Sequence, residues 1–173
     1  MPAAPFAGDA EAMARALAEA EKSLAAGDMP VGAALVIGGR IVDAARNTIG
    51  STRTLIAHAE MTLLIRHGSV IFGALARDPQ AVSLFTTLEP CLMCLSACAH
   101  SRVSRVVYAC RDEVAGAAKH AAPSAWYRSF WPAIEHQDAL QADSARLLLR
   151  YSDNRPGFDD LRRALLEITG RSA

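Results

Sequence analysis

The fold is decided by two stretches, Ala57-His58-Ala59-Glu60 and Pro90-Cys91-Leu92-Met93-Cys94. Histidine nitrogen and cysteine sulfur are preferred zinc ligands, and Cys91 and Cys94, at i and i+3, share one face of a helical turn. A structural zinc site is closed by four protein ligands, whereas a catalytic site keeps three and leaves the fourth position for water. The pattern therefore predicts a catalytic zinc centre, Zn²⁺ held by His58, Cys91 and Cys94.

Glu60 is a fourth functional group that need not be a ligand. It lies just beyond His58 in the sequence, so it can reach a water in the open position without entering the coordination shell. Zinc in such a site lowers the pKa of that water to about 7. A carboxylate beside the water can take its proton and pass it on, as a general base and then a general acid. We therefore expect Glu60 to be catalytic.

Other interpretations of these motifs stay open. A lone His-x-Glu carries little information, and a lone Cys-x-x-Cys also occurs in redox pairs and in four-cysteine structural sites. Cys98 lies one turn beyond Cys94 and could close the site, which would make the chain a structural zinc-binding module; Glu60 would have no role there. The other interpretation of Cys98, and of Cys110, is a small buried residue. The remaining histidines are expected at the surface or at caps: His67, His100, His120 and His136.

Length and composition favour one domain. At 173 residues, 51% hydrophobic and 21% charged, the chain lies in the ordinary globular range. We predict one domain over residues 1–173, with a motif-bearing core over about 10–151 and a helical tail over 152–173. Eighteen basic residues balance eighteen acidic ones, which argues against a cationic field for nucleic acid. The arginines that could still bind phosphate are Arg102, Arg105, Arg111, Arg162 and Arg163.

Export and membrane signals are not evident in the sequence. Residues 1–8 lack a basic region followed by an apolar run, and nowhere is there an uncharged apolar stretch of about 18 residues. In such a chain a Cys-x-x-Cys indicates metal or redox chemistry before a disulfide framework. We therefore expect a cytoplasmic protein that does not enter a membrane.

Hydrophobic periodicity and turn residues predict alternating helices and strands. Helix patterns, the first with Asp9 as a possible cap, cover residues 9–26, 57–67 (ended by Gly68), 91–100, 143–151 and 159–168. Strand patterns cover 31–37 and 40–45, joined by Gly38-Gly39 as a hairpin, then 81–87, 103–110 and 134–137. Residues 47–56 are expected to form a loop. This order predicts an α/β fold with helices on both faces of a sheet.

Several motifs together make the chain similar to a known family. They are Asp28-Met29-Pro30-Val31-Gly32-Ala33, Ala57-His58-Ala59-Glu60, Thr87-Leu88-Glu89-Pro90-Cys91-Leu92-Met93-Cys94, His100-Ser101-Arg102-Val103 and Val107-Tyr108-Ala109. The chain resembles the cytidine and deoxycytidylate deaminase superfamily, in the branch with bacterial tRNA adenosine deaminases and guanine deaminases. The resemblance implies a three-layer α/β/α fold with a mixed five-stranded sheet whose last two strands run parallel, and a homodimer.

The resemblance also implies a reaction and roles for residues. An exocyclic amino group of a nucleobase would be replaced by oxygen, with ammonia released; His58, Cys91 and Cys94 would hold zinc and Glu60 would shuttle protons. Asn47 would hydrogen-bond the base, although a turn residue with a self-satisfied side chain is an equally good interpretation. The backbone amides of Ala59 and Cys91 would bind the ring substituent.

The substrate is less well determined than the reaction. Balanced charge favours a small nucleobase, nucleoside or related amino-heterocycle; the alternative is adenosine in tRNA. The branch commonly has Asp-Pro-Thr where this chain has Thr54-Leu55-Ile56, and the basic C-terminal helix of a tRNA-binding member is only weakly echoed by Arg162-Arg163. The aromatic residues Trp126, Tyr127, Phe130 and Trp131 favour packing over a base-stacking lid. The motifs do not distinguish purine from pyrimidine.

Overall fold

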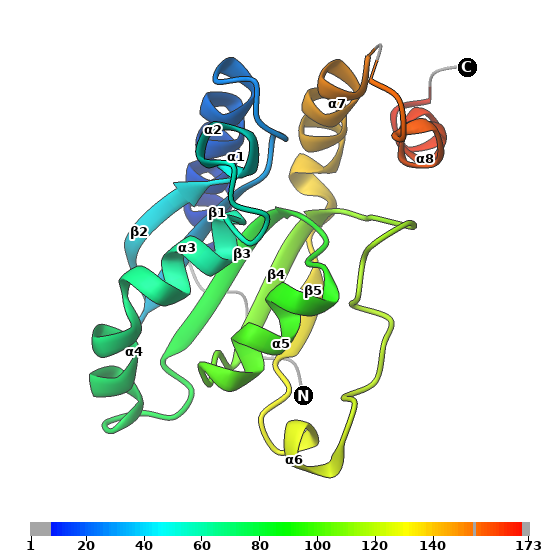
Figure 1. The fold of residues 1–173 in the computed structure, drawn as a ribbon. Coiled ribbons are helices and arrows are strands. Elements are labelled where there is room, and N and C mark those ends of the chain that lie inside the picture. The colour runs from blue at the N-terminus through cyan, green and yellow to red at the C-terminus, as the bar shows by residue number, and fades with distance from the viewer. Residues whose placement is uncertain (1–7, 154, 171–173) are drawn as a thin grey trace.

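The structure is a computed structural model that describes residues 8–153 and 155–170 (Figure 1). Residues 1–7, on which the prediction of no export signal partly rests, lie outside the described residues, as does the end of the predicted tail. The centre is a five-stranded sheet in the order β2-β1-β3-β4-β5. Its strands are β1 (Gly32–Ile37), β2 (Arg40–Arg46), β3 (Val82–Leu88), β4 (Arg105–Cys110) and β5 (Ala133–His136).

The sheet is mixed, as the resemblance implied. β1 pairs antiparallel with both β2 and β3, whereas β3, β4 and β5 run parallel. The predicted hairpin is confirmed: Gly38 and Gly39, between β1 and β2, have φ of 56° and 77°. Two positive φ angles in a two-residue turn match the twist of a hairpin and favour glycine.

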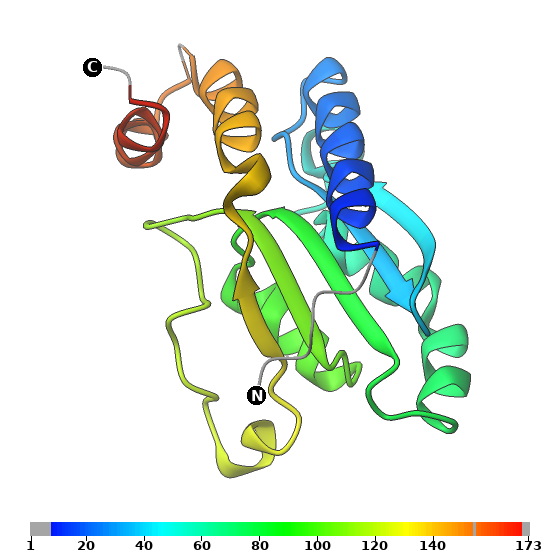
Figure 2. The same ribbon diagram turned by 180° about the vertical axis from the view of Figure 1, so that it is seen from behind.

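Helices cover both faces of the sheet, which confirms the three-layer architecture. One face carries α1 (Asp9–Ala25) and α7 (Gln141–Ser152), seen most clearly in Figure 2. The other carries α3 (Ala59–Arg66), α4 (Gly68–Leu75) and α5 (Leu92–His100). Alternate residues of β1 face opposite layers: Ala34 and Val36 pack with α1, Ala33 and Leu35 with α3 and α5.

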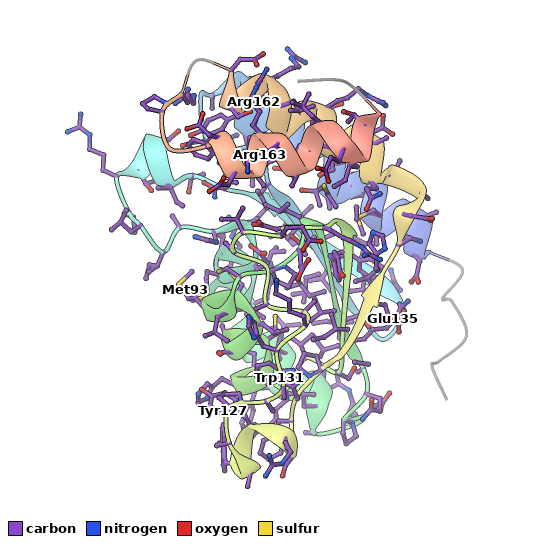
Figure 3. The ribbon with its side chains drawn as sticks, turned by 90° about the vertical axis from the view of Figure 1, so that its right-hand side faces the viewer. Met93, Tyr127, Trp131, Glu135, Arg162 and Arg163 are labelled. Carbon is purple, nitrogen blue, oxygen red and sulfur yellow. The ribbon has the colours of Figure 1, made fainter. Side chains whose placement is uncertain are left out.

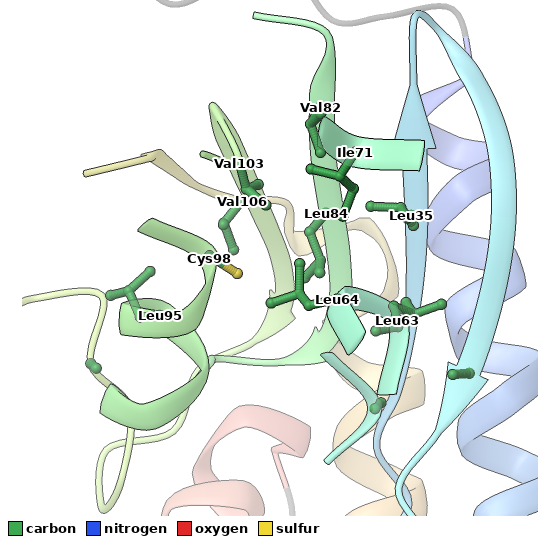
Figure 4. Packing of buried hydrophobic residues seen from close by; sticks show 14 residues of the cluster. Leu35, Leu63, Leu64, Ile71, Val82, Leu84, Leu95, Cys98, Val103 and Val106 are labelled. Atoms are coloured by element: carbon green, nitrogen blue, oxygen red, sulfur yellow. The ribbon is translucent and has the colours of Figure 1, made fainter. Parts of the chain in front are cut away.

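The largest core cluster lies between the sheet and the layer that contains α3 and α5 (Figure 4). Leu63 from α3, Leu84 from β3, Leu95 from α5 and Val106 from β4 are all buried there. Burying a side chain of this size stabilises the fold by about 1.5–3 kcal/mol. Cys98 belongs to the same cluster and is fully buried, which supports its interpretation as a small core residue.

The tail packs on the carboxyl end of the sheet through a separate cluster. α8 (Asp159–Thr169) lies against α7, and its Leu161 and Leu165 join Leu148 of α7 and Leu88 of β3. Cys110 is buried in this cluster, as predicted. Within the described ranges, no helix is both long and apolar enough to cross a membrane.

Two local predictions were wrong, the cap at Asp9 and the loop over 47–56. Asp9 does not cap α1, since Gly8 is the N-cap and the carboxylate of Asp9 instead accepts hydrogen bonds from Arg105. The helix predicted over 57–67 does end before Gly68, at Arg66, and a second helix, α4, starts at Gly68. The expected loop over 47–56 contains a short helix, α2 (Ile49–Thr52).

Candidate active site

His58 and Cys91 occupy the same structural position on two neighbouring helices. His58 is the N-cap of α3 and Cys91 the N-cap of α5, both with extended backbone (φ −71°, ψ 154° and φ −69°, ψ 168°). Cys94 lies one turn into α5 and is buried. Neither side chain makes a capping hydrogen bond to the described backbone of its helix, so the imidazole and the thiol are left for other partners.

The three side chains come together as a metal site. His58 Nδ1 lies 3.5 Å from Cys94 Sγ and 4.0 Å from Cys91 Sγ, and all three ligand atoms lie within 4.8 Å of one another. Tetrahedral zinc with ordinary bond lengths separates its nitrogen and sulfur ligands by about 3.6 Å. The donor set and its spacing therefore fit zinc. In the part of the chain that the structure describes, only His58, Cys91 and Cys94 form such a group, and Cys98 is not among them.

The surroundings favour a thiolate at Cys91 and a thiol at the two core cysteines, Cys98 and Cys110. A hydrogen bond from the Cys94 thiol, supported by His58, lowers the pKa of Cys91 to about 4. The partial positive charge at the start of α5 acts in the same direction. Burial raises the pKa of Cys98, and that of Cys110 to about 12. Among these three cysteines the thiolate is thus favoured at the metal site and disfavoured in the core.

Glu60 has a buried carboxylate that is only partly satisfied. It is the second residue of α3 and is 3% exposed. Its Oε1 accepts a hydrogen bond from the Thr86 hydroxyl of β3 at 3.3 Å, while its Oε2 is buried and has no hydrogen-bond partner among the described residues. Burial raises the pKa of this carboxyl. A buried polar atom without a partner marks a place where water, an ion or a substrate completes the bonding.

Asn47 and Ala59, the proposed substrate-binding residues, are both buried. Asn47 Oδ1 accepts a hydrogen bond from the Ile49 amide at 3.0 Å, which is the turn that the alternative interpretation required. This turn uses only the carbonyl oxygen, and the amide nitrogen carries two further donors. Ala59 is the first residue of α3, and the first amides of a helix have no partner within it.

Asp28 was not assigned a role in the site from the sequence. It is almost fully buried and accepts hydrogen bonds from the Ser51 amide at 2.9 Å and from the Ser51 hydroxyl. Ser23 supports the same segment, since its hydroxyl donates to the carbonyl of Asn47 at 2.8 Å. These contacts fix the segment that carries Asn47. No local signal could have indicated them, because the partners are 23 and 24 residues apart.

The aromatic residues lie away from the metal ligands. Helix α6 (Ala125–Arg128) packs at the carboxyl end of α5, where the Tyr127 hydroxyl lies 2.9 Å from His100 Nε2. The guanidinium of Arg102 lies 3.2 Å from the ring centroid of Phe130. Figure 3 shows Tyr127 and Trp131 at one end of the molecule and Met93, beside the metal ligands, farther up. The packing interpretation is therefore supported within this chain.

Comparisons with known proteins agree with this site. Residues 7–110, which include all three metal ligands and Glu60, match the cytidine and deoxycytidylate deaminase zinc-binding region. Over 104 residues the chain is 39% identical to the tRNA-specific adenosine deaminase of Bacillus subtilis. The matched region covers 60% of this chain and 63% of that protein. The chain thus spans less than two thirds of the length of this relative.

Two solved structures share the fold. One, from work on A-to-I editing by tRNA:A34 deaminases at the wobble position of transfer RNA, has a TM-score of 0.62 at 27% identity, covering 80% of this chain and 99% of the other. The guanine deaminase of Bacillus subtilis has a TM-score of 0.52 at 32% identity, covering 60% and 64%. Proteins with two different substrates thus resemble this chain.

Proposed function

The chain belongs to the cytidine and deoxycytidylate deaminase family, and from this premise we propose that it is a zinc-dependent hydrolase of amino-heterocycles. It would replace the exocyclic amino group of a nucleobase, nucleoside or related compound with oxygen and release ammonia. The observation that carries the proposal is the unpartnered buried oxygen of Glu60 beside three zinc ligands. A zinc ion held by His58, Cys91 and Cys94 would supply a Lewis acid that activates water.

Glu60 would move two protons during the reaction. The oxygen of water bonds to the ring carbon, and Glu60 carries the first proton to the adjacent ring nitrogen. The second proton passes to the amino group, the carbon–nitrogen bond breaks, and ammonia leaves a carbonyl behind. The Thr86 hydroxyl holds Oε1, so Oε2 is the oxygen that exchanges protons. Burial, which raises the pKa of this carboxyl, suits a group that must hold a proton between steps.

A small-molecule substrate is supported by the arginines because most of those that could bind phosphate already contact other side chains. Four of the five that could bind phosphate have other partners: Arg105 pairs with Asp9 and Glu135, Arg102 stacks on Phe130, Arg162 pairs with Asp153, and Arg163 pairs with Asp160. Of these five, Arg111 alone makes no ion pair or stacking contact with the described residues. Binding to a nucleic-acid backbone depends on several unneutralised cations.

Exposed apolar side chains also neighbour the metal ligands in the chain. Leu55, which is 82% exposed, and Ile56 precede His58 in the chain, and the exposed Leu92 follows Cys91. An apolar rim suits the faces of a free heterocycle better than the phosphates that flank a base in RNA. We therefore place a free base or nucleoside first.

Adenosine in tRNA is the second candidate. It is favoured by the 39% identity to the tRNA-specific adenosine deaminase of Bacillus subtilis and by the likeness to a structure from tRNA:A34 deaminase work. Deamination within tRNA requires the base to be turned out of the stack and the neighbouring phosphates to be held. Affinity for tRNA that falls steeply with salt would support this candidate, and its absence would support the small molecule.

The test is ammonia release from zinc-loaded protein with guanine, adenine, cytosine, their nucleosides, simple aminotriazines and tRNA. The Glu60→Ala variant, loaded with zinc in the same way, is the control for background hydrolysis. We expect release from at least one free base or nucleoside and none from the variant. Failure to release ammonia from every compound, with zinc bound, would contradict the proposal.

We also propose that the protein is a cytoplasmic homodimer. Support for a second copy comes from apolar side chains on the helix layer that carries the site: Phe72 is 80% exposed on α4 and Ile65 is exposed on α3. Support for a reducing compartment comes from the four described cysteines, which are all free. Sedimentation of the wild type beside Phe72→Ser tests the dimer: a wild-type monomer would contradict it.

A further inference from the structure

Glu89 is a buried acid for which the proposed reaction has no use. It follows β3 directly and precedes the Pro90-Cys91 pair. Its side chain is largely buried and makes no ion pair with the described residues. Instead its carboxylate accepts two backbone hydrogen bonds, Oε2 from the Asp112 amide at 3.1 Å and Oε1 from the Ala118 amide at 3.0 Å. One carboxylate therefore joins both ends of the segment 112–118.

This segment is wound tightly around Glu89. The side chain of Asp112 accepts hydrogen bonds from the amides of Val114 and Ala115, each at 2.9 Å. Gly116 lies where no side chain fits: a Cβ there would be 2.3 Å from the carbonyl oxygen of Asp112 and 2.4 Å from the carboxyl carbon of Glu89. The glycine is thus required for close approach to Glu89.

The same segment holds the backbone of a metal ligand. Gly116 forms an antiparallel bridge with Cys91, and the Ala117 amide donates to the carbonyl of Pro90 at 3.0 Å. On its other side, the carbonyl of Cys91 accepts the Leu95 amide at 3.0 Å within α5. Cys91 is therefore fixed between a helix and the segment 112–118, and Glu89 fixes that segment.

We propose that Glu89 is a positioning residue for the metal centre, which acts through the segment 112–118 to set the place of the Cys91 sulfur. A glutamine at this position has the same shape but only one acceptor oxygen, whereas both partners of Glu89 are donors. One amide would then face the NH₂ group, and the segment would move away from Cys91. The inference rests on the metal site of the proposed function.

The test measures metal binding without substrate. Cobalt(II) is titrated into metal-free wild type, Glu89→Gln and Gly116→Ala, with a chelator as competitor, and the cobalt spectrum is recorded. Loss of a group that orients a ligand lowers metal affinity by roughly 10–100-fold. We expect a loss of this size in both variants, with a changed spectrum, and recovery toward wild type in Glu89→Asp, which keeps two acceptor oxygens. Should Glu89→Gln be unstable, Glu89→Asp and Gly116→Ala still allow the comparison.

The matched control is Asp9→Asn. Asp9 is also a buried carboxylate with two hydrogen bonds, but its partner Arg105 begins β4, at the end of the sheet opposite Cys91. This variant should lose stability and keep cobalt affinity. If Glu89→Gln behaves in the same way, with wild-type affinity and spectrum, Glu89 is merely structural and the inference fails. If wild type itself binds no cobalt, the premise of the proposed function fails instead.

Discussion

Two buried carboxylates at opposite ends of the sheet have opposite surroundings. Asp9, 4% exposed, has both oxygens bonded by Arg105, at 2.9 and 2.6 Å, and the same guanidinium bonds Glu135. Glu60 is equally buried, yet one of its oxygens has no hydrogen-bond partner within the described ranges. A buried charge is tolerated when it is paired and costs free energy when it is not. The surroundings of Asp9 therefore stabilise its charge, whereas those of Glu60 do so only in part, which is consistent with the catalytic role proposed for Glu60.

The comparison extends to the segments that carry each acid. Asp9 ties the start of α1 to β4 and β5, far in sequence but within one rigid network. Glu60 lies on the same short helix as a metal ligand, at a point where two helix N-termini meet. Substitutions of Asp9 should change the stability of the fold without affecting the rate of the reaction. Substitutions of Glu60 should lower the rate of the reaction without lowering the stability.

Glu60→Gln gives the largest expected effect on activity. The glutamine side chain cannot exchange protons, so turnover should fall by about 10²–10⁴-fold, the usual contribution of a general base. Stability should be unchanged or higher, because an unpartnered buried charge is removed. Ammonia release, zinc content and urea unfolding measure the three quantities. Near-wild-type turnover with zinc bound would remove Glu60 from the mechanism.

Arg105→Ala gives the largest expected effect on stability. It leaves two carboxylates, Asp9 and Glu135, without their cation, and breaking a buried ion pair on one side costs about 3–5 kcal/mol. Urea unfolding measures the loss, and cobalt affinity should stay at the wild-type value. Reduced metal affinity in a folded variant would show that the two ends of the sheet are coupled.

Much of this architecture was predictable because its signals are local. The hairpin follows from Gly38-Gly39, and the metal ligands follow from an i, i+3 cysteine pair and a His-x-Glu at the start of a helix. The predicted sheet, the helices on both faces and the burial of Cys98 are confirmed. Each of these depends on residues a few positions apart or on hydrophobic periodicity.

The supporting contacts were not predictable, since they join residues far apart in the chain. Arg105 and Asp9 are 96 positions apart, and Glu89 and Ala118 are 29 apart. No spacing rule relates such pairs before the fold is known. The wrong cap at Asp9 has the same origin: its carboxylate was expected to bond its own helix and is held by a distant arginine instead.

Thr86→Val tests whether the Thr86 hydroxyl orients the carboxylate of Glu60. The valine is similar in shape but cannot donate to Glu60 Oε1, which would leave both carboxylate oxygens without a protein partner. We expect turnover to fall by about tenfold, as for other groups that orient a functional residue, with zinc content unchanged. Thr87→Val, next in the same strand, is a control for the loss of a buried hydroxyl. An equal loss of turnover in both variants would argue against a specific role for Thr86.

Asp28 is a third buried carboxylate, and it gives the smallest expected effect. Burial by itself raises its pKa, but the hydrogen bonds from Ser51 and the nearby Arg46 outweigh burial, so the pKa lies below the ordinary value of 3.8. A depressed pKa contributes stability that is fully present above the unfolded value and is lost as the pH falls through the folded value. Wild type should therefore lose stability relative to Asp28→Asn below about pH 4, where the unfolded chain takes up the proton first.

At pH 7 the same variant should cost only about 1 kcal/mol, since asparagine keeps one acceptor oxygen for Ser51. Urea unfolding of both proteins between pH 3 and 7 measures the difference. Because Ser51 follows the segment that carries Asn47, KM should rise more than kcat falls if Asn47 binds the substrate. A stability difference that is independent of pH would show that Asp28 resembles a neutral hydrogen-bond acceptor. In that case the negative charge of Asp28 would contribute little to stability, unlike that of Asp9, which forms an ion pair with Arg105.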